Sequence, residues 1–259
     1  MPYLKCVNED EAKYILEEIH ERICGDHVGP RSLVSKVIWT GYFWPTMQMD
    51  VVELIKKCDK CQWFGNVQRL PAERLTTITS PWPFAQWRID IFGPLPLGKG
   101  QVKFLLVAID YFTKWVEAEA LTTITEAKIW NFVWKNIICR FGIPMMIISD
   151  NGRQFDNQGF RDFCSGLGIK NQFSSPGHPQ ANEQTKVANQ TLLKIIKAKL
   201  DNAKGAWLEE LPNILWAYRT TARTLTRETP FRLTYGTKAI ISVEVGVASI
   251  RREDRKSVV

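Results

Sequence analysis

The sequence lacks the features of secreted and membrane proteins. No apolar stretch approaches the roughly 20 residues that a membrane helix needs, and no signal-like apolar run follows Met1. The 6 cysteines are not spaced as a disulfide framework, which a chain of 259 residues does not need. We find no internal repeat and no low-complexity tract. These absences predict a globular intracellular protein without a membrane partner.

Acidic residues are scarce outside the first quarter of the chain. The formal net charge is +7, yet residues 1–66 hold 8 basic and 10 acidic side chains, which leaves 26 basic and 17 acidic side chains in the remainder. A basic region behind a mildly acidic one is typical of proteins that bind a polyanion, and nucleic acid is the leading candidate. The alternative is an ordinary surplus of surface lysine.

Histidine is rare as well, and 2 of the 3 histidines lie near the start of the chain. His20 and His27 precede the pair Cys58 and Cys61, which are spaced as Cys-x-x-Cys. Two imidazoles and two thiolates suit a tetrahedral zinc ion. The alternative is a chance cysteine pair beside histidines at helix ends. Cys24 lies between the histidines, and we interpret it as a packing residue.

Three short helices are predicted around these four residues. The first begins at Asn8, which can cap it together with Glu11, and the others follow Pro30 and Thr46. A segment of about 60 residues has little core of its own, so that bound zinc would stabilise its fold directly.

From residue 83 onward the pattern changes to alternating strands and helices, after a polar, proline-containing linker. This order is typical of a mixed α/β sheet with helices packed on it. The predicted strands are 87–92, 103–110, 114–118, 145–149 and 170–174, and the predicted helices are 125–141, 157–167, about 182–200, about 206–219 and 230–235.

Two aspartates stand at the ends of apolar strands. Asp90 lies in WRIDIFGP, and Asp150 lies in IISDNGRQF, where Gly152 allows a sharp turn. Burying a carboxylate is costly unless it is compensated, and two converging carboxylates repel unless a divalent cation neutralises them. The pair therefore suggests a Mg²⁺ site for phosphoryl transfer. A simple turn is the alternative for Asp150, and a structural role is favoured for Asp110.

Several motifs, in order and spacing, resemble the integrase of plant Ty3/gypsy-type LTR retrotransposon polyproteins. They are the His-His-Cys-Cys set, WRIDIFGPLP, FLLVAIDYFTKWVEA, FGIPMMIISDNGRQF, SSPGHPQAN and WAYRTTARTLTRETPFRLTYG. The resemblance covers roughly residues 12–245. It implies a zinc-binding domain (8–66), a linker (67–82), an RNase H-like catalytic core with a mixed five-stranded sheet (83–240), and a truncated or divergent tail (241–259).

The same resemblance implies the activity and the partners. Such integrases process 3′ ends and transfer DNA strands with Mg²⁺ or Mn²⁺, act on element ends and a target duplex in the nucleus, and work as homo-oligomers. Their catalytic residues are an Asp, Asp, Glu triad, and Asp90 and Asp150 match its first two positions.

At the third position of the triad this chain has Lys186. An ammonium cannot ligate Mg²⁺ and repels it, so we expect activity to be lowered by orders of magnitude. Glu183 lies one helical turn earlier and is a candidate substitute, although pairing with Lys186 or exposure to solvent is the favoured interpretation.

The predicted helix after SSPGHPQAN has a basic face that suits DNA. Lys186, Lys194 and Lys197 can share this face, and His178 precedes it in the loop. An ordinary amphipathic surface helix is the alternative. The sequence thus predicts an integrase-like DNA-binding polynucleotidyl transferase, impaired at Lys186, or else a non-catalytic, zinc-stabilised nucleic-acid-binding remnant.

Overall fold

A computed structural model describes most of the chain in two compact units. The described residues are 4–21, 25, 27–64, 80–150, 152, 154–173, 207–223 and 226–247. Contacts group the described residues up to 64 with 212–247 as the first unit, and 80–173 with 207–211 as the second. The domain boundaries given by the sequence stay predictions. Among the described residues, no helix has the length and apolar character needed to cross a bilayer.

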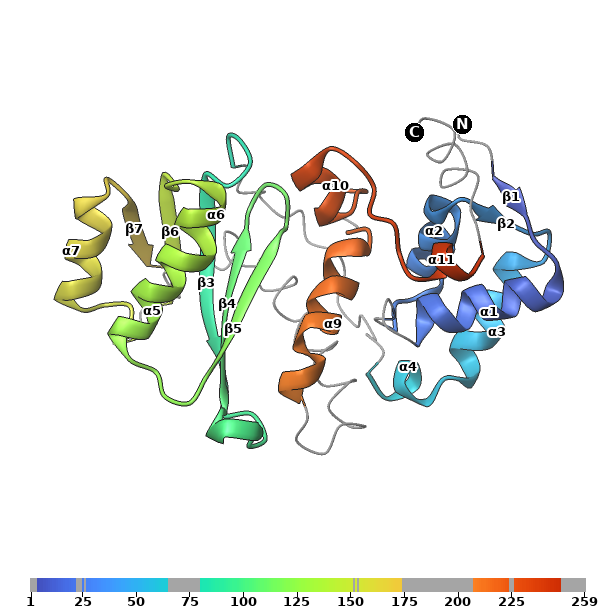
Figure 1. Cartoon of the computed structure of the whole chain (residues 1–259), viewed down its shortest axis with the longest axis horizontal. Helices are drawn as coiled ribbons and strands as arrows, with labels where there is room; N and C mark the ends of the chain where they lie inside the picture. Colours follow the sequence, from blue (N-terminus) through green and yellow to red (C-terminus); the bar gives the residue numbers. More distant parts are fainter. Residues whose placement is uncertain are drawn as a thin grey trace, which may run out of the picture. The chain divides into compact units, whose positions relative to one another are not determined.

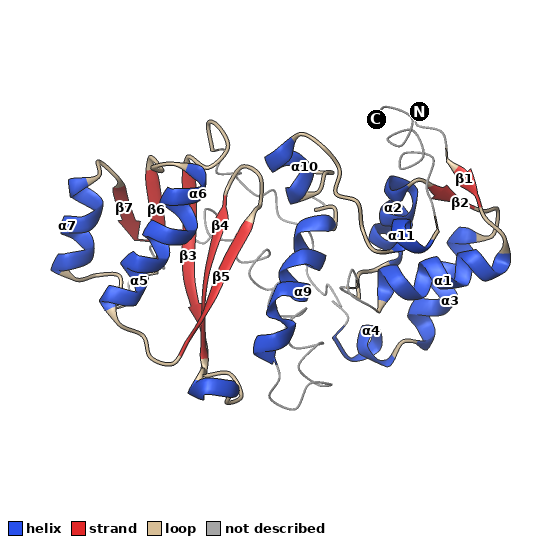
Figure 2. Ribbon diagram, viewed as in Figure 1, coloured by secondary structure: helices blue, strands red, loops and turns tan. Residues whose placement is uncertain are grey.

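The first unit is built from short helices and one small strand pair (Figures 1 and 2). The capping box predicted at Asn8 and Glu11 is present, since each side chain accepts a hydrogen bond from the other's backbone N–H. Gly41 ends the second helix in the left-handed region, with φ of 99°. The elements are β1 (Lys5–Cys6), α1 (Glu9–His20), α2 (Pro30–Thr40), β2 (Tyr42–Phe43), α3 (Met47–Lys57), α4 (Asp59–Phe64), α10 (Pro230–Tyr235) and α11 (Val243–Gly246).

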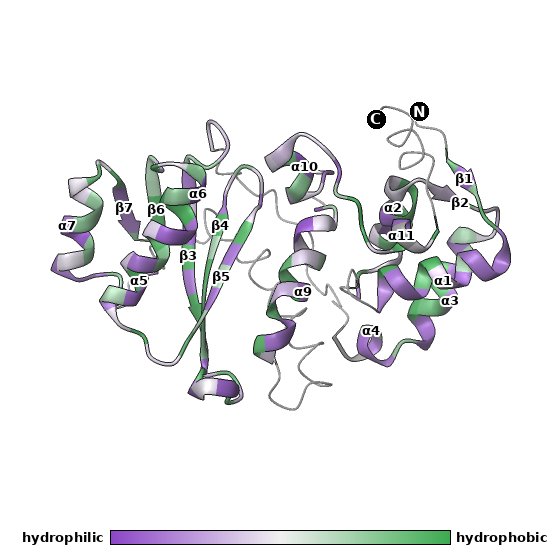
Figure 3. Cartoon of the chain, viewed as in Figure 1, coloured by the Kyte–Doolittle hydropathy of each residue, from purple (hydrophilic) through white to green (hydrophobic). Residues whose placement is uncertain are grey.

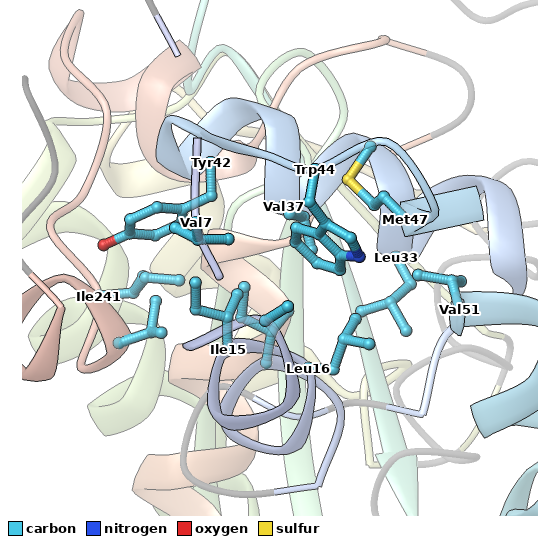
Figure 4. Close-up of a cluster of buried hydrophobic side chains, with 13 residues drawn as sticks. Val7, Ile15, Leu16, Leu33, Val37, Tyr42, Trp44, Met47, Val51 and Ile241 are labelled. Carbon is cyan, nitrogen blue, oxygen red and sulfur yellow. The ribbon is translucent and has the colours of Figure 1, made fainter. Parts of the chain in front are cut away.

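The core of this unit joins the two ends of the chain (Figure 4). Ile15 and Ile19 of α1 are fully buried, as their helical spacing predicts. Ile241 and Val243 pack into the same cluster. The Tyr42 hydroxyl donates a hydrogen bond to the backbone carbonyl of Val247. Residues 241–247, which the sequence assigns to a truncated or divergent tail, thus contribute to the first unit.

The second unit contains the predicted mixed sheet of five strands, in the order β5-β4-β3-β6-β7. The strands β3, β4 and β5 are antiparallel, whereas β6 and β7 run parallel to β3. Figure 3 shows that β4 and β6 are mostly hydrophobic and that the edge strand β7 is hydrophilic. The strands are β3 (Gln86–Phe92), β4 (Phe104–Asp110), β5 (Val116–Leu121), β6 (Met146–Ser149) and β7 (Lys170–Phe173).

Helices cover one face of this sheet. Trp87 of β3 lies 5.4 Å, ring centroid to ring centroid, from Phe141 of α6, so the segment from α5 to α6 packs on the face that carries Trp87. Side chains alternate along a strand, so Arg88 and Asp90 point to the opposite face. The helical elements of this unit are η1 (Lys99–Gln101), α5 (Glu126–Phe132), η2 (Val133–Ile138), α6 (Cys139–Phe141) and α7 (Gln158–Gly166). A further helix, α9 (Trp207–Thr220), has residues in both units.

The sequence predicted all the longer elements among the described residues and only some of the short ones. The strand and helix predictions agree with the structure to within about three residues at each end, apart from the helix predicted at about 182–200, which lies outside the described residues. The predicted helix 125–141 is continuous but contains a π-helical segment, η2. Five elements of two to six residues, β1, β2, α4, η1 and α11, were not predicted.

Candidate zinc site and catalytic site

The four predicted zinc ligands come together in the first unit. His20 is the last residue of α1, and His27 lies in the loop before α2 with a positive φ of 49°. Cys58 ends α3, and Cys61 lies in α4. One ligand atom from each residue lies within 4.8 Å of all the others.

The separations between these atoms fit a tetrahedral zinc ion. The Sγ of Cys58 lies 3.4 Å from Nδ1 of His27, and the Sγ of Cys61 lies 3.4 Å from Nε2 of His20 and 3.9 Å from Nδ1 of His27. Zn–S and Zn–N bonds of about 2.3 and 2.05 Å at tetrahedral angles give an S···N separation of about 3.6 Å. The donor set and its geometry therefore fit zinc.

A glycine allows the two histidines to approach each other. A Cβ on Gly25 would lie only 2.4 Å from the backbone carbonyl oxygen of His20. Only a residue without a side chain lets the loop pass this close to the end of α1. The approach brings the two imidazole rings to 4.8 Å between centroids. Gly25 carries no sequence signal of this role, because the atom that it approaches belongs to the backbone. Cys24 lies outside the described residues.

Asp90 and Asp150 each follow the last paired residues of two parallel strands of the second unit. The register pairs Arg88 with Ile148 and Ile89 with Ser149, so the next residue on each strand is Asp90 and Asp150 respectively. Residues paired in this way point to the same face of a sheet. This register is compatible with the metal-site hypothesis, and two carboxylates are a donor set that suits a hard divalent cation. The assignment of Asp90 and Asp150 as metal ligands stays a prediction.

The two carboxylates have different surroundings. Asp90 lies within β3, and its side chain is 14% exposed. Asp150 is exposed just beyond β6, and its Oδ1 accepts a hydrogen bond from the backbone N–H of Gly152 at 3.1 Å. This contact is the hydrogen bond of an Asx-type turn, in which an aspartate side chain accepts from the backbone two residues on.

Asp90 already has a cationic partner that the sequence analysis missed. The Arg88 Nε donates to Asp90 Oδ2 at 2.8 Å, and Nη2 donates to Oδ1 at 3.2 Å. Burial lowers the pKa of Arg88, but its hydrogen bond and charge interaction with Asp90, together with Tyr111, outweigh burial and raise the pKa above its usual value. The i, i+2 spacing of an arginine and an aspartate on one strand face was the available signal.

Asp110 has the structural role that the sequence favoured. It pairs in register with Trp87, so it points away from the face that carries Asp90. Its carboxylate accepts hydrogen bonds from the backbone N–H groups of Phe84 and Thr113 and from the Thr113 hydroxyl. Burial raises the pKa of Asp110, and these hydrogen bonds oppose the rise. The residue shapes the turn after β4.

The remaining predicted site residues lie outside the part of the chain that the structure describes. They are His178, Glu183, Lys186, Lys194 and Lys197. Their assignments stay predictions.

Comparison with protein families finds two matches in the predicted order. Residues 7–65 match the family described as the integrase zinc binding domain, and residues 81–179 match the integrase core domain. These matches support the predicted cofactors, which are zinc in the first domain and Mg²⁺ in the core.

Curated relatives include polyproteins of retroviruses and of a retrotransposon. The chain is 29% identical over 214 residues to the Pro-Pol polyprotein of Simian foamy virus type 3 (strain LK3), covering 81% of this chain and 18% of that protein. It is 29% identical over 228 residues to the Gag-Pol polyprotein of Gibbon ape leukemia virus (88% and 13%). It is 26% identical over 223 residues to the Transposon Tf2-3 polyprotein of Schizosaccharomyces pombe (85% and 17%). The chain thus spans less than a fifth of these relatives.

A solved structure supports the fold. The chain resembles a protein chain in the cryo-EM structure of the simian T-cell lymphotropic virus intasome in complex with PP2A regulatory subunit B56 gamma, with a TM-score of 0.54. The match covers 87% of this chain and 74% of that chain at 21% identity. The predicted fold class, a five-stranded integrase core behind a small zinc-binding domain, is confirmed.

Proposed function

The chain carries an integrase zinc-binding domain followed by an integrase core domain, and on this premise we propose that it is the DNA-joining part of an LTR-retroelement polyprotein. The proposed reaction is 3′-end processing of element DNA and its transfer into a target duplex. The observation that supports the proposal is the parallel register of β3 and β6, which pairs Ile89 with Ser149, the residues immediately before Asp90 and Asp150. The plant Ty3/gypsy origin, the nuclear location and assembly into a homo-oligomer are part of the same proposal.

In this proposal Asp90 and Asp150 hold the divalent cation. Asp90 presents its carboxylate from a central strand, and Asp150 presents its carboxylate from the turn that Gly152 closes. When bound, the cation supplies activation of the attacking oxygen and stabilisation of the leaving oxygen in phosphoryl transfer. The basic side chains His178, Lys194 and Lys197 would contact DNA phosphates, which fits the surplus of positive charge after residue 66.

Lys186 sets the level of activity that we expect. Two unit charges about 4 Å apart near a protein surface interact with about 4 kcal/mol, and each 1.36 kcal/mol added to a barrier slows a reaction about tenfold. A lysine in place of the third carboxylate therefore predicts a loss of roughly a thousandfold. Glu183 would have to supply any residual third ligand.

A strand-transfer assay tests this proposal. Labelled duplex donors with blunt or recessed 3′ ends would be incubated with a supercoiled plasmid and Mg²⁺ or Mn²⁺. We expect Lys186→Glu to join donor to plasmid at least a hundredfold faster than the parent chain. Lys186→Ala controls for removal of the positive charge, and Lys186→Glu combined with Asp90→Asn should be inactive. If Lys186→Glu joins no DNA with either metal, position 186 is not the cause of inactivity.

The second candidate is a non-catalytic DNA-binding remnant. The basic balance of the chain and the charge at Lys186 favour it, because both support DNA binding and neither supports cleavage. It predicts that the logarithm of the DNA-binding constant falls linearly with the logarithm of the salt concentration. It also predicts no preference for DNA sequence and no joining of DNA by any variant. Fluorescence anisotropy at several salt concentrations, run beside the joining assay, separates the two candidates.

A further inference from the structure

Arg88 forms an ion pair with Asp90, whose carboxylate is a metal ligand in the proposed function. Its Nε and Nη2 each donate to a different oxygen of Asp90, at 2.8 and 3.2 Å. The two residues are two positions apart on β3 and therefore share one face of the sheet. Such a two-point contact between a guanidinium and a carboxylate is both stronger and more directional than a single hydrogen bond.

The contact lies in a sheltered position. The side chains of Arg88 and Asp90 are 10% and 14% exposed. The strand neighbours of Arg88 are Ile109 on β4 and Ile148 on β6, which supply no competing charge. Solvent therefore screens this ion pair less than an exposed one. Among the described residues, the other arginine–carboxylate contacts have an arginine side chain at least 42% exposed.

A divalent cation and this guanidinium compete for Asp90. Mg²⁺ and Mn²⁺ need carboxylate oxygens as ligands, and both oxygens of Asp90 already accept from Arg88. A cation held between Asp90 and Asp150 would also lie close to the positive charge of Arg88, and like charges at that separation repel. Both effects lower the affinity for the cation as long as Arg88 stays in place.

We propose that Arg88 is an internal counter-ion that occupies Asp90 in the metal-free protein, so that loading of the cation requires Arg88 to leave the carboxylate. The inference rests on the proposed function in taking Asp90 as a cation ligand. It adds that this chain binds the cation weakly for a reason independent of Lys186. Arg88 is a positioning residue here, since it acts on the cation through Asp90.

Mn²⁺ binding to the full chain tests this inference without relying on activity. The chain would first be saturated with zinc, and Mn²⁺ would then be titrated by isothermal calorimetry. We expect Arg88→Met, which keeps a long side chain and removes the charge, to lower the Kd for Mn²⁺ by about tenfold or more, because a charge-assisted contact no longer opposes binding. Arg88→Lys keeps the charge but loses the two-point contact of the guanidinium. Its Kd for Mn²⁺ should lie between those of Arg88→Met and the parent.

Two further variants control the measurement. Arg140→Ala removes an arginine of the same unit that pairs with Glu117 at 2.8 Å, and it should leave the Kd unchanged. Asp90→Asn should abolish the binding that Arg88→Met strengthens, which assigns that binding to Asp90. Thermal unfolding gives a second measurement: Mn²⁺ should raise the Tm of Arg88→Met more than that of the parent.

The inference is overturned if folded Arg88→Met binds Mn²⁺ no more tightly than the parent, or binds none. If Arg88→Met does not fold, an unchanged Kd for Arg88→Lys overturns it instead. DNA binding of the same samples, measured by anisotropy, reports on the proposed function separately. If the samples bind no DNA but Arg88→Met still binds Mn²⁺ more tightly than the parent, the proposed function is rejected. The role of Arg88 as a counter-ion of Asp90 is then supported.

Discussion

Substitution at Gly25 should weaken the zinc site although it spares the four ligands. A Cβ at this position would lie 2.4 Å from the His20 carbonyl oxygen and 2.6 Å from the Glu21 backbone nitrogen. Both distances are far below van der Waals contact, so the loop must move by roughly an ångström. Zinc–ligand distances tolerate about ±0.2 Å, and changes just outside the ligands typically cost about 10–100-fold in metal affinity. We expect Gly25→Ser to lose affinity within that range.

Gly29→Ser is the matched control for this prediction. It lies in the same loop, and a Cβ there meets no atom within 4 Å. Gly29 is also the N-cap of α2, where serine is favoured. Competition with a chromogenic zinc chelator measures both affinities, and far-UV circular dichroism follows the fold. Equal affinities for the two serine variants would refute the argument that the close approach of Gly25 positions His27.

Three further predictions concern buried groups. Ile241→Ala should destabilise the first unit by about 2–4 kcal/mol, because Ile241 is 3% exposed in its core. Ile240→Ala, at a site 36% exposed, should cost far less. Urea unfolding measures both free energies, and equal losses would contradict the packing of Ile241. The raised pKa of Asp110 means that its carboxyl group binds a proton more tightly in the folded state than in the unfolded state. Its contribution to the free energy of unfolding therefore falls as pH rises from about 4 through the folded pKa. Asp110→Asn should remove this pH dependence from urea unfolding, and an unchanged dependence would contradict the raised pKa. Burial raises the pKa of the Cys164 thiol to about 11, so iodoacetamide at pH 8 should label exposed Cys139 much faster than Cys164, and equal labelling by mass spectrometry would contradict that burial.

Local chemistry explains which parts of the structure the sequence could predict. The capping box at Asn8 and Glu11 depends on residues three apart, and the zinc ligands are residue types with few other uses at such spacing. Arg88 was missed although it lies only two residues before Asp90, because the role proposed for the pair depends also on the register of β3 against β6, which sets Ile89 opposite Ser149. That register is a non-local pairing, and no short stretch of sequence encodes it.

The C-terminal segment shows the same limit. Residues from 241 onward were predicted to form a truncated or divergent tail, yet Ile241 and Val243 are buried against helices near the start of the chain. Two isolated apolar residues give no periodic pattern, so the sequence does not indicate which core they join. The structure shows that they pack with residues of the N-terminal helices. The zinc-binding unit therefore includes a segment more than 170 residues away from its last predicted ligand, Cys61.

The central claim is that Asp90 and Asp150 share one divalent cation, and anomalous diffraction from crystals grown with Mn²⁺ tests it most directly. Crystals of Arg88→Met combined with Lys186→Glu would remove both opposing charges. The account predicts an anomalous peak at coordination distance from a carboxylate oxygen of each aspartate. If crystals at saturating Mn²⁺ show no ion shared by the carboxylates of Asp90 and Asp150, the claim is contradicted.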